Sequence, residues 1–129
     1  MGSTYKGGAP HHHSIGDNLP SVQSAYPRKG NHFGDSHNKS TYTYEIIAHD
    51  PMKEAKDFYD KIGLGGLYVR KGPNGMEIVK MKDGSLIVYR PVTSSDGSPA
   101  VEINLKKSSD SGGIKSHKIH FVGKKGKKK

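Results

Sequence analysis

The chain has 129 residues, the length of one domain, and only 31% of them are hydrophobic. Cysteine is absent, which excludes disulfides, thiolate catalysis and cysteine-ligated zinc, and no stretch approaches the roughly 20 apolar residues that span a bilayer. Lys and Arg number 21 against 12 Asp and Glu, and the net charge of +9 favours a polyanionic partner, nucleic acid before an anionic membrane.

Residues 1–41 differ in amino-acid composition from the rest of the chain. They are rich in Gly, Ser, Pro, His and Asn and show neither helical nor strand periodicity, which predicts a flexible linker or arm. The run His11, His12 and His13 can bind a transition metal, although such a run is more often part of a polar linker. We expect one folded domain over residues 42–123 and a basic tail over residues 124–129.

The folded part is predicted to begin with an extended segment at residues 42–48 and a helix at residues 50–62. Asp50 is a good N-cap, and Pro51 is tolerated at the first helical position. Gly63 is expected to end the helix. An apolar stripe at helical spacing predicts that the helix packs on a sheet, and it consists of Met52, Ala55, Phe58, Tyr59 and Ile62.

Strands are predicted in quick succession after the helix, at residues 67–70, 76–82, 85–92, 100–106 and 114–122. Asp83-Gly84 is the strongest hairpin signal, because a type I′ turn needs positive φ at both of its centres. Four consecutive apolar residues in the third strand indicate a central position with both faces covered. The expected fold class is α+β, with the helix packed on a small twisted antiparallel sheet of about four to five strands.

Strand alternation predicts a polar surface on this sheet. Glu102 is expected to point to the opposite side of the sheet from its apolar neighbours in the strand. The same holds for Lys118 and His120 in the last strand. If the last two strands are neighbours, these three side chains share one face, and Arg90 can reach it from the end of the central strand. The same alternation is also typical of a merely solvated sheet face.

An acid, a histidine, a lysine and an arginine suit metal-free cleavage of RNA. A base takes the 2′-hydroxyl proton, an acid protonates the leaving 5′-oxygen, and cations stabilise the phosphorane. Histidine transfers protons near neutral pH, and arginine binds phosphate in a bidentate way. The predicted catalytic residues are His120 as general base or acid, Glu102 as its partner, and the phosphate-binding Arg90 and Lys118.

Substrate-binding residues are predicted on either side of this surface. The hydroxyls of Thr93, Ser94 and Ser95 are expected to bind phosphate oxygens. Lys124 and Lys125 of the tail are expected to neutralise backbone phosphates without reading sequence, and a solubilising tail is the alternative.

No metal or other cofactor is expected. Magnesium sites use clustered carboxylates, whereas the acidic residues here are scattered, and several lie in predicted turns where Asp is common for backbone reasons. His117 faces the apolar side by parity and is expected to be structural. No catalytic role is expected for His32, His37 or His49, which lie in or near the linker.

An ordered series of segments resembles the C-terminal toxin modules of Gram-positive polymorphic toxins, which follow LXG, WapA-like or RHS-type N-terminal regions. The resemblance covers nearly all of residues 42–122, while residues 21–34 match only loosely. The matching segments are residues 50–62, Gly65-Gly66, residues 81–95, residues 97–103 and residues 114–121.

The resemblance implies a domain of a larger secreted toxin that acts in the cytoplasm of a target cell and is neutralised by an immunity protein. Modules of this kind are similar to the barnase, EndoU, colicin and RelE class of metal-independent ribonucleases, which often cut tRNA. A metal-dependent DNase and a non-enzymatic basic nucleic-acid-binding module stay as alternatives. A monomer without a membrane partner is expected. The positions to which the resemblance assigns functional roles are Arg90, Thr93, Ser94, Ser95, Glu102, Lys118 and His120.

Overall fold

The computed structural model describes residues 14–26, 28–36, 42–82, 84–92, 97–106 and 113–123, without the side chains of Tyr68 and Pro73. The helical elements are α1 (Ile15–Ala25), α2 (Pro51–Ile62) and the 3-10 turn η1 (Pro73–Gly75). The strands are β1 (Arg28–Lys29), β2 (His32–Phe33), β3 (Asp35–Ser36), β4 (Thr43–Ala48), β5 (Leu67–Lys71), β6 (Glu77–Lys80), β7 (Leu86–Arg90), β8 (Ala100–Asn104) and β9 (His117–Gly123).

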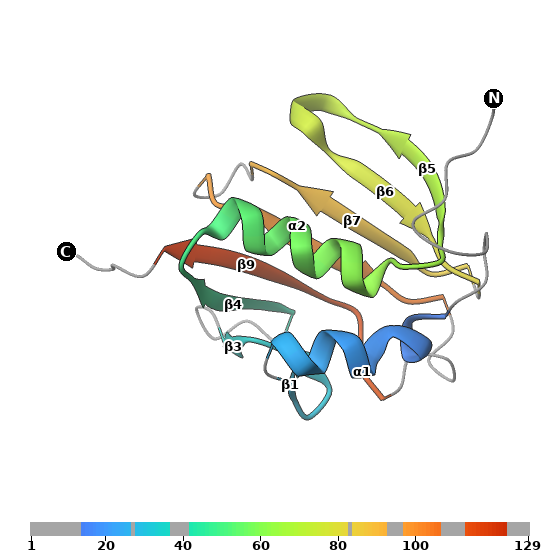
Figure 1. Ribbon diagram of the computed structural model, residues 1–129, viewed down its shortest axis with the longest axis horizontal. Helices are drawn as coiled ribbons and strands as arrows, with labels where there is room; N and C mark the ends of the chain where they lie inside the picture. Colours follow the sequence, from blue (N-terminus) through green and yellow to red (C-terminus); the bar gives the residue numbers. More distant parts are fainter. Residues whose placement is uncertain are drawn as a thin grey trace.

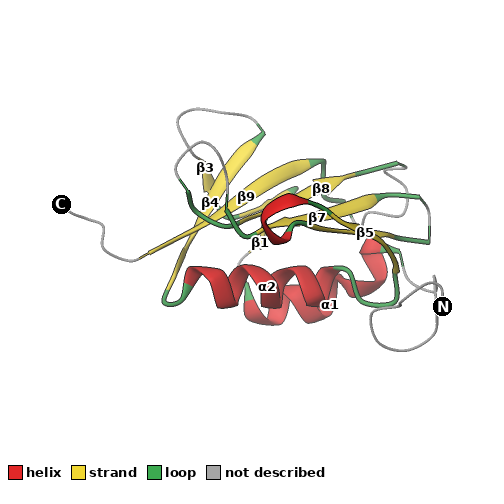
Figure 2. Ribbon diagram, turned by 90° about the horizontal axis from the view of Figure 1, so that it is seen from above, coloured by secondary structure: helices red, strands yellow, loops and turns green. Residues whose placement is uncertain are grey.

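These strands form a seven-stranded sheet in the order β3-β4-β9-β8-β7-β6-β5 and a separate β1-β2 pair (Figure 1). The two α-helices lie on one face of the large sheet, and the described residues place no α-helix on the other (Figure 2). We call this second surface the helix-free face. The predicted α+β class is confirmed, but the sheet is larger than the four to five strands expected.

One strand pair departs from the antiparallel sheet that was predicted. Strands β5 to β9 form an antiparallel meander, but β9 then pairs in parallel with β4, with Tyr44 opposite Ile119. The cause is α2, which carries the chain from the end of β4 back to the start of β5, so that these two strands run in the same direction. As the fifth strand of the meander, β9 shares that direction and adds beside β4.

Helix α2 follows the predicted pattern. The Asp50 side chain accepts a hydrogen bond from the Lys53 amide at 3.3 Å, and Pro51 occupies the first turn. Gly63 caps the C-terminal end. Met52 was expected on the apolar stripe but is 48% exposed, so the stripe begins one turn later. The stripe residues that are buried against the sheet are Ala55, Phe58, Tyr59 and Ile62.

Helix α1 lies within residues 1–41, for which we predicted a linker, and for this segment that prediction was wrong. Ser14 and Asp17 form a capping box that begins the helix, and Pro20 lies inside it. The Asn18 amide donates to the carbonyls of Ile62 at 2.7 Å and Leu64 at 2.9 Å, which satisfies the C-terminal end of α2. The apolar residues that α1 buries are Ile15, Leu19 and Val22.

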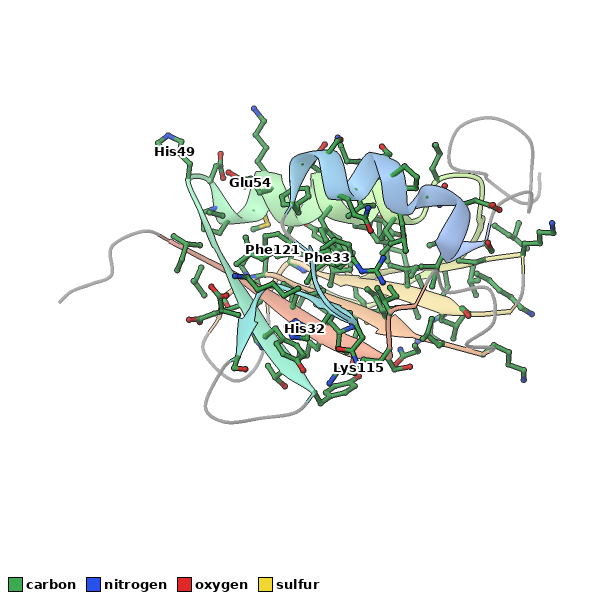
Figure 3. All side chains as sticks on the ribbon, turned by 90° about the horizontal axis from the view of Figure 1, so that it is seen from below. His32, Phe33, His49, Glu54, Lys115 and Phe121 are labelled. Atoms are coloured by element: carbon green, nitrogen blue, oxygen red, sulfur yellow. The ribbon has the colours of Figure 1, made fainter. Side chains whose placement is uncertain are left out.

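Aromatic side chains fill the layer between the helices and the sheet. Phe58 of α2 meets Tyr26, Phe33 and Phe121 edge to face, with ring centroids 5.2–5.6 Å apart. Figure 3 shows Phe33 and Phe121 together in this layer. This aromatic packing fills the space between the helices and the sheet, so the helix-covered face is part of the core.

Candidate active site

The strand register brings the four predicted catalytic residues onto neighbouring strands of the sheet. Strands β7, β8 and β9 lie side by side, and Glu102 pairs directly with Lys118. Ala100 lies between Arg90 on one side and His120 on the other. Their intervening neighbours, which belong to the buried core, are Ile87, Tyr89, Val101, Ile103, Ile119 and Phe121. Alternation therefore places all four predicted residues on the helix-free face.

Glu102 is held through both of its carboxylate oxygens. Oε1 lies 3.4 Å from Nη2 of Arg90, and Oε2 accepts a hydrogen bond from the Tyr42 hydroxyl at 3.3 Å. The Glu102 side chain is 20% exposed and that of Arg90 is 40% exposed. The carboxylate thus stands beside a permanent cation that solvent can reach.

Lys118 adds a second cation next to this carboxylate. It lies directly opposite Glu102, and its own main-chain amide donates to the Tyr42 carbonyl at 2.9 Å. Within the described part of the chain, the Lys118 ammonium forms no ion pair. Its charge is therefore available to an anionic ligand.

His120 lies on the helix-free face, as predicted, but its surroundings are more enclosed than the sequence suggested. Its Nδ1 is 2.8 Å from the Ser98 hydroxyl, and the register places it between Ala100 of β8 and Glu45 of β4. The residue is only 4% exposed, because β4 covers the side that an edge strand would leave open. The imidazole is therefore almost completely covered by its neighbours.

Three residues of this site were missed by the sequence prediction: Tyr42, Glu45 and Ser98. Glu45 could have been found by extending strand parity to residues 42–48, but only if the parallel pairing of β4 with β9 had been known. Ser98 lies beside an open hollow of about 400 Å³ at the end of β9, which Pro51 and Val122 also line. Tyr42 and Ser98 lie outside regular strands, so no periodic signal marks them.

The predicted binding residues Thr93, Ser94, Ser95, Lys124 and Lys125 lie outside the described residues. The same holds for His37 and for the run of histidines at residues 11–13. The described residues stop at Val92, just after β7, and resume at Gly97, which directly precedes Ser98.

His117 lies on the other side of β9, in the core, and is structural as predicted. Its Nε2 accepts a hydrogen bond from the Phe33 amide at 3.1 Å, and its Nδ1 donates to the Lys115 carbonyl at 2.7 Å. Burial lowers the pKa of His117 to about 4, despite the opposing hydrogen bond to Lys115. The neutral ring therefore ties β2 to β9.

His32 and His49 lie away from the site. His32 stacks on Tyr44 with ring centroids 3.8 Å apart, and Figure 3 shows it near Lys115. His49 lies beside Glu54 at the start of α2, where its amide donates to the Glu54 carboxylate at 3.2 Å (Figure 3). Neither residue shares a surface with Glu102.

The hollow beside His49 is lined by more acidic than basic side chains. It measures about 390 Å³, and its charged lining consists of the carboxylates of Asp50, Glu54 and Asp57 and the ammonium of Lys53. The Tyr26 hydroxyl donates to Asp57 at 2.8 Å, and burial together with this carboxylate raises the tyrosine pKa. Acidic side chains thus outnumber basic ones in this hollow, whereas the cations Arg90 and Lys118 lie on the helix-free face.

Two other kinds of feature are absent from the residues that the structure describes. No group of three or more His, Cys, Asp or Glu side chains among them could hold a metal ion. None of their helices is long and apolar enough to cross a membrane. Comparison with protein-family models, with curated proteins and with solved structures finds no match to the chain.

Proposed function

We propose that the chain is the RNA-cleaving domain of a secreted bacterial competition toxin, an endoribonuclease that uses general acid/base catalysis without a metal ion. The observation that carries the proposal is the grouping of Arg90, Glu102, Lys118 and His120 on three adjacent strands of the helix-free face. The net charge of +9 supports a nucleic acid as the substrate. We expect tRNA to be the RNA that is cut.

The reaction is an attack of a ribose 2′-oxygen on the adjacent phosphorus. The P–O5′ bond breaks, which yields one fragment with a 2′,3′-cyclic phosphate and one with a 5′-hydroxyl. Glu102 and His120 are diagonal neighbours on β8 and β9, a relation that separates Cα atoms by about 7–8 Å. One of them takes the 2′-hydroxyl proton, and the other protonates the leaving 5′-oxygen from the opposite side of the phosphate.

The two cations stabilise the charge that builds on the phosphorane. Arg90 supplies a planar donor group that matches two phosphate oxygens, and Lys118 supplies a point charge directly beside Glu102. In the free protein Arg90 contacts Glu102, so on binding it exchanges or shares this partner with the phosphate. Thr93, Ser94, Ser95, Lys124 and Lys125 are proposed to hold neighbouring phosphates.

The biological setting is proposed from the sequence resemblance to polymorphic toxin modules. The domain is delivered by a larger secreted protein into the cytoplasm of a competing cell, acts there as a monomer without a membrane partner, and is neutralised by a cognate immunity protein. Production of the chain in the bacterial cytoplasm is then expected to arrest growth. Normal growth with abundant folded protein would contradict the toxin assignment.

The direct test is to incubate the purified chain with total RNA and with plasmid DNA, each with and without EDTA. The proposal predicts cleavage of RNA that EDTA does not change. Cleavage of DNA that EDTA abolishes would instead favour a metal-dependent DNase. Binding without cleavage of either polymer would favour a non-enzymatic basic module, and both results would overturn the proposal.

A further inference from the structure

Tyr42 occupies an unusual position on the helix-free face. It directly precedes β4, yet its hydroxyl donates to the carboxylate of Glu102 on β8 at 3.3 Å. Strand β9 lies between β4 and β8 in the sheet order, so the tyrosine side chain must cross β9 to make this contact. The ring therefore lies over the strand that carries Lys118 and His120.

Tyr42 is also partly open to solvent and lies near both a carboxylate and a guanidinium. The residue is 37% exposed although its hydroxyl is hydrogen-bonded to Glu102, which in turn contacts Arg90. The main chains of Tyr42 and Lys118 are neighbours, since the Lys118 amide donates to the Tyr42 carbonyl, and Arg90 contacts the other oxygen of Glu102. Exposed aromatic rings beside phosphate-binding cations are how proteins hold unpaired nucleotides.

The hydroxyl end of Tyr42 is suited to a separate task. Partial burial, followed by the charge and hydrogen bond of Glu102, raises the pKa of Tyr42. The phenol is thus a hydrogen-bond donor at neutral pH. It restrains Oε2 of Glu102 while Arg90 restrains Oε1.

We infer that Tyr42 has two separable roles: its ring stacks on an unpaired base of the substrate, and its hydroxyl positions Glu102. The second role rests on the proposed ribonuclease function, whereas the first concerns binding alone. A base inside a duplex is already stacked on both sides and offers no free face to the ring. The inference therefore assigns the site to single-stranded segments and loops rather than to helical RNA.

The ring is tested by binding, with a 2′-O-methyl oligonucleotide as a probe that cannot be cut through its 2′-oxygen. Fluorescence anisotropy is measured with the single-stranded probe, its duplex and an abasic strand of equal charge. Tyr42→Leu is expected to weaken single-strand binding about tenfold, as the loss of one stacked base implies, while Tyr42→Phe binds like the wild type. The duplex and abasic strands should be bound equally by all three proteins.

The matched control is Val69→Ala, which removes an exposed apolar side chain from β5 at the far edge of the sheet. It should leave all three affinities unchanged. If Tyr42→Leu binds the single strand as tightly as the wild type, or weakens the abasic strand equally, the stacking role is wrong. Absence of any RNA binding by the wild-type chain would overturn it as well.

The hydroxyl is tested by cleavage kinetics on single-stranded RNA. Tyr42→Phe is expected to lower kcat several-fold at unchanged KM, because the base site is intact and only the restraint on Glu102 is lost. Tyr42→Leu should raise KM in addition. Equal kcat for Tyr42→Phe and wild type would exclude the positioning role. If the wild type cuts no RNA, the proposed function and this role fail together, while the binding results still decide the role of the ring.

Discussion

Two histidines on β9 differ because they lie on opposite faces of the same strand. His117 faces the helices, is fully buried and bonds to main-chain groups through both ring nitrogens. His120, three residues later, faces the helix-free side and contacts the hydroxyl of Ser98 among charged neighbours. The two residues are close in sequence, yet one closes the core and the other borders a polar surface.

The two histidines differ in how freely their hydrogen-bond partners can move. Main-chain partners such as the Phe33 amide and the Lys115 carbonyl hold His117 in one tautomer, and burial keeps it neutral. A side-chain partner such as Ser98 can rotate about its own bonds, so under the proposed function His120 could exchange it for a substrate group. Variants on the two faces should therefore separate stability from activity.

The largest effect is expected from His120→Ala. Removal of a general acid or base should lower RNA cleavage by about 100- to 10,000-fold, while the fold is retained at lower stability, because truncation of this buried side chain leaves a cavity. Cleavage rates are measured together with the urea unfolding midpoint. Near-wild-type cleavage by a folded His120→Ala protein would exclude His120 from the chemistry.

The next effect is expected from Arg90→Lys, which keeps the charge but loses the planar fork. We expect cleavage to fall about 100-fold, because a single ammonium cannot hold Glu102 and two phosphate oxygens as the guanidinium does. Lys80→Arg on the same face of β6 is the control and should cut normally. Full activity of Arg90→Lys would show that Arg90 contributes only its positive charge and not its planar donor group.

On the opposite face, His117 predicts a dependence of stability on pH. Its pKa is about 4 in the folded chain and 6.5 without the fold, so between these values the unfolded chain binds a proton that the folded chain does not. Stability should therefore fall as the pH drops from 6.5 to 4, by about 3 kcal/mol in total. Urea unfolding at a series of pH values measures this slope, and a flat profile would contradict it.

The smallest effect is expected from His117→Phe. The Phe33 amide then loses its acceptor, which should cost about 1–3 kcal/mol of unfolding free energy and remove the part of the pH dependence that His117 contributes. His49→Ala, at an exposed position, is the control and should leave stability unchanged. If cleavage by folded His117→Phe falls as far as that of His120→Ala, the division between the two faces is wrong.

Local patterns predicted most of the folded elements. Asp50 with Pro51 marked the start of α2, and Gly84, at a φ of 93°, forms the turn that Asp83-Gly84 predicted. Parity placed Glu102, Lys118 and His120 on one face because β8 and β9 are adjacent. Each of these inferences needs only neighbouring residues and the period of a helix or strand.

The features that were missed depend on contacts between distant segments. Helix α1 is stabilised by Asn18, which caps a helix end 44 residues away, and its sequence includes a helix-breaking Pro20. The parallel β4–β9 pair joins two strands that are far apart in the sequence. Spacing along the chain therefore could not predict that Glu45 lies beside His120 or that the Tyr42 hydroxyl contacts Glu102. Register, not composition, decides these contacts.

We propose that the helix-free face cleaves RNA through the 2′-oxygen by acid/base chemistry. The most direct measurement compares cleavage, in EDTA, of a single-stranded RNA oligonucleotide with cleavage of the same strand carrying 2′-O-methyl groups throughout. We predict that the unmodified strand is cut to fragments ending in 2′,3′-cyclic phosphate and that the methylated strand stays intact. Equal cutting of both strands, or no cutting of the unmodified strand until a divalent metal is added, would contradict it.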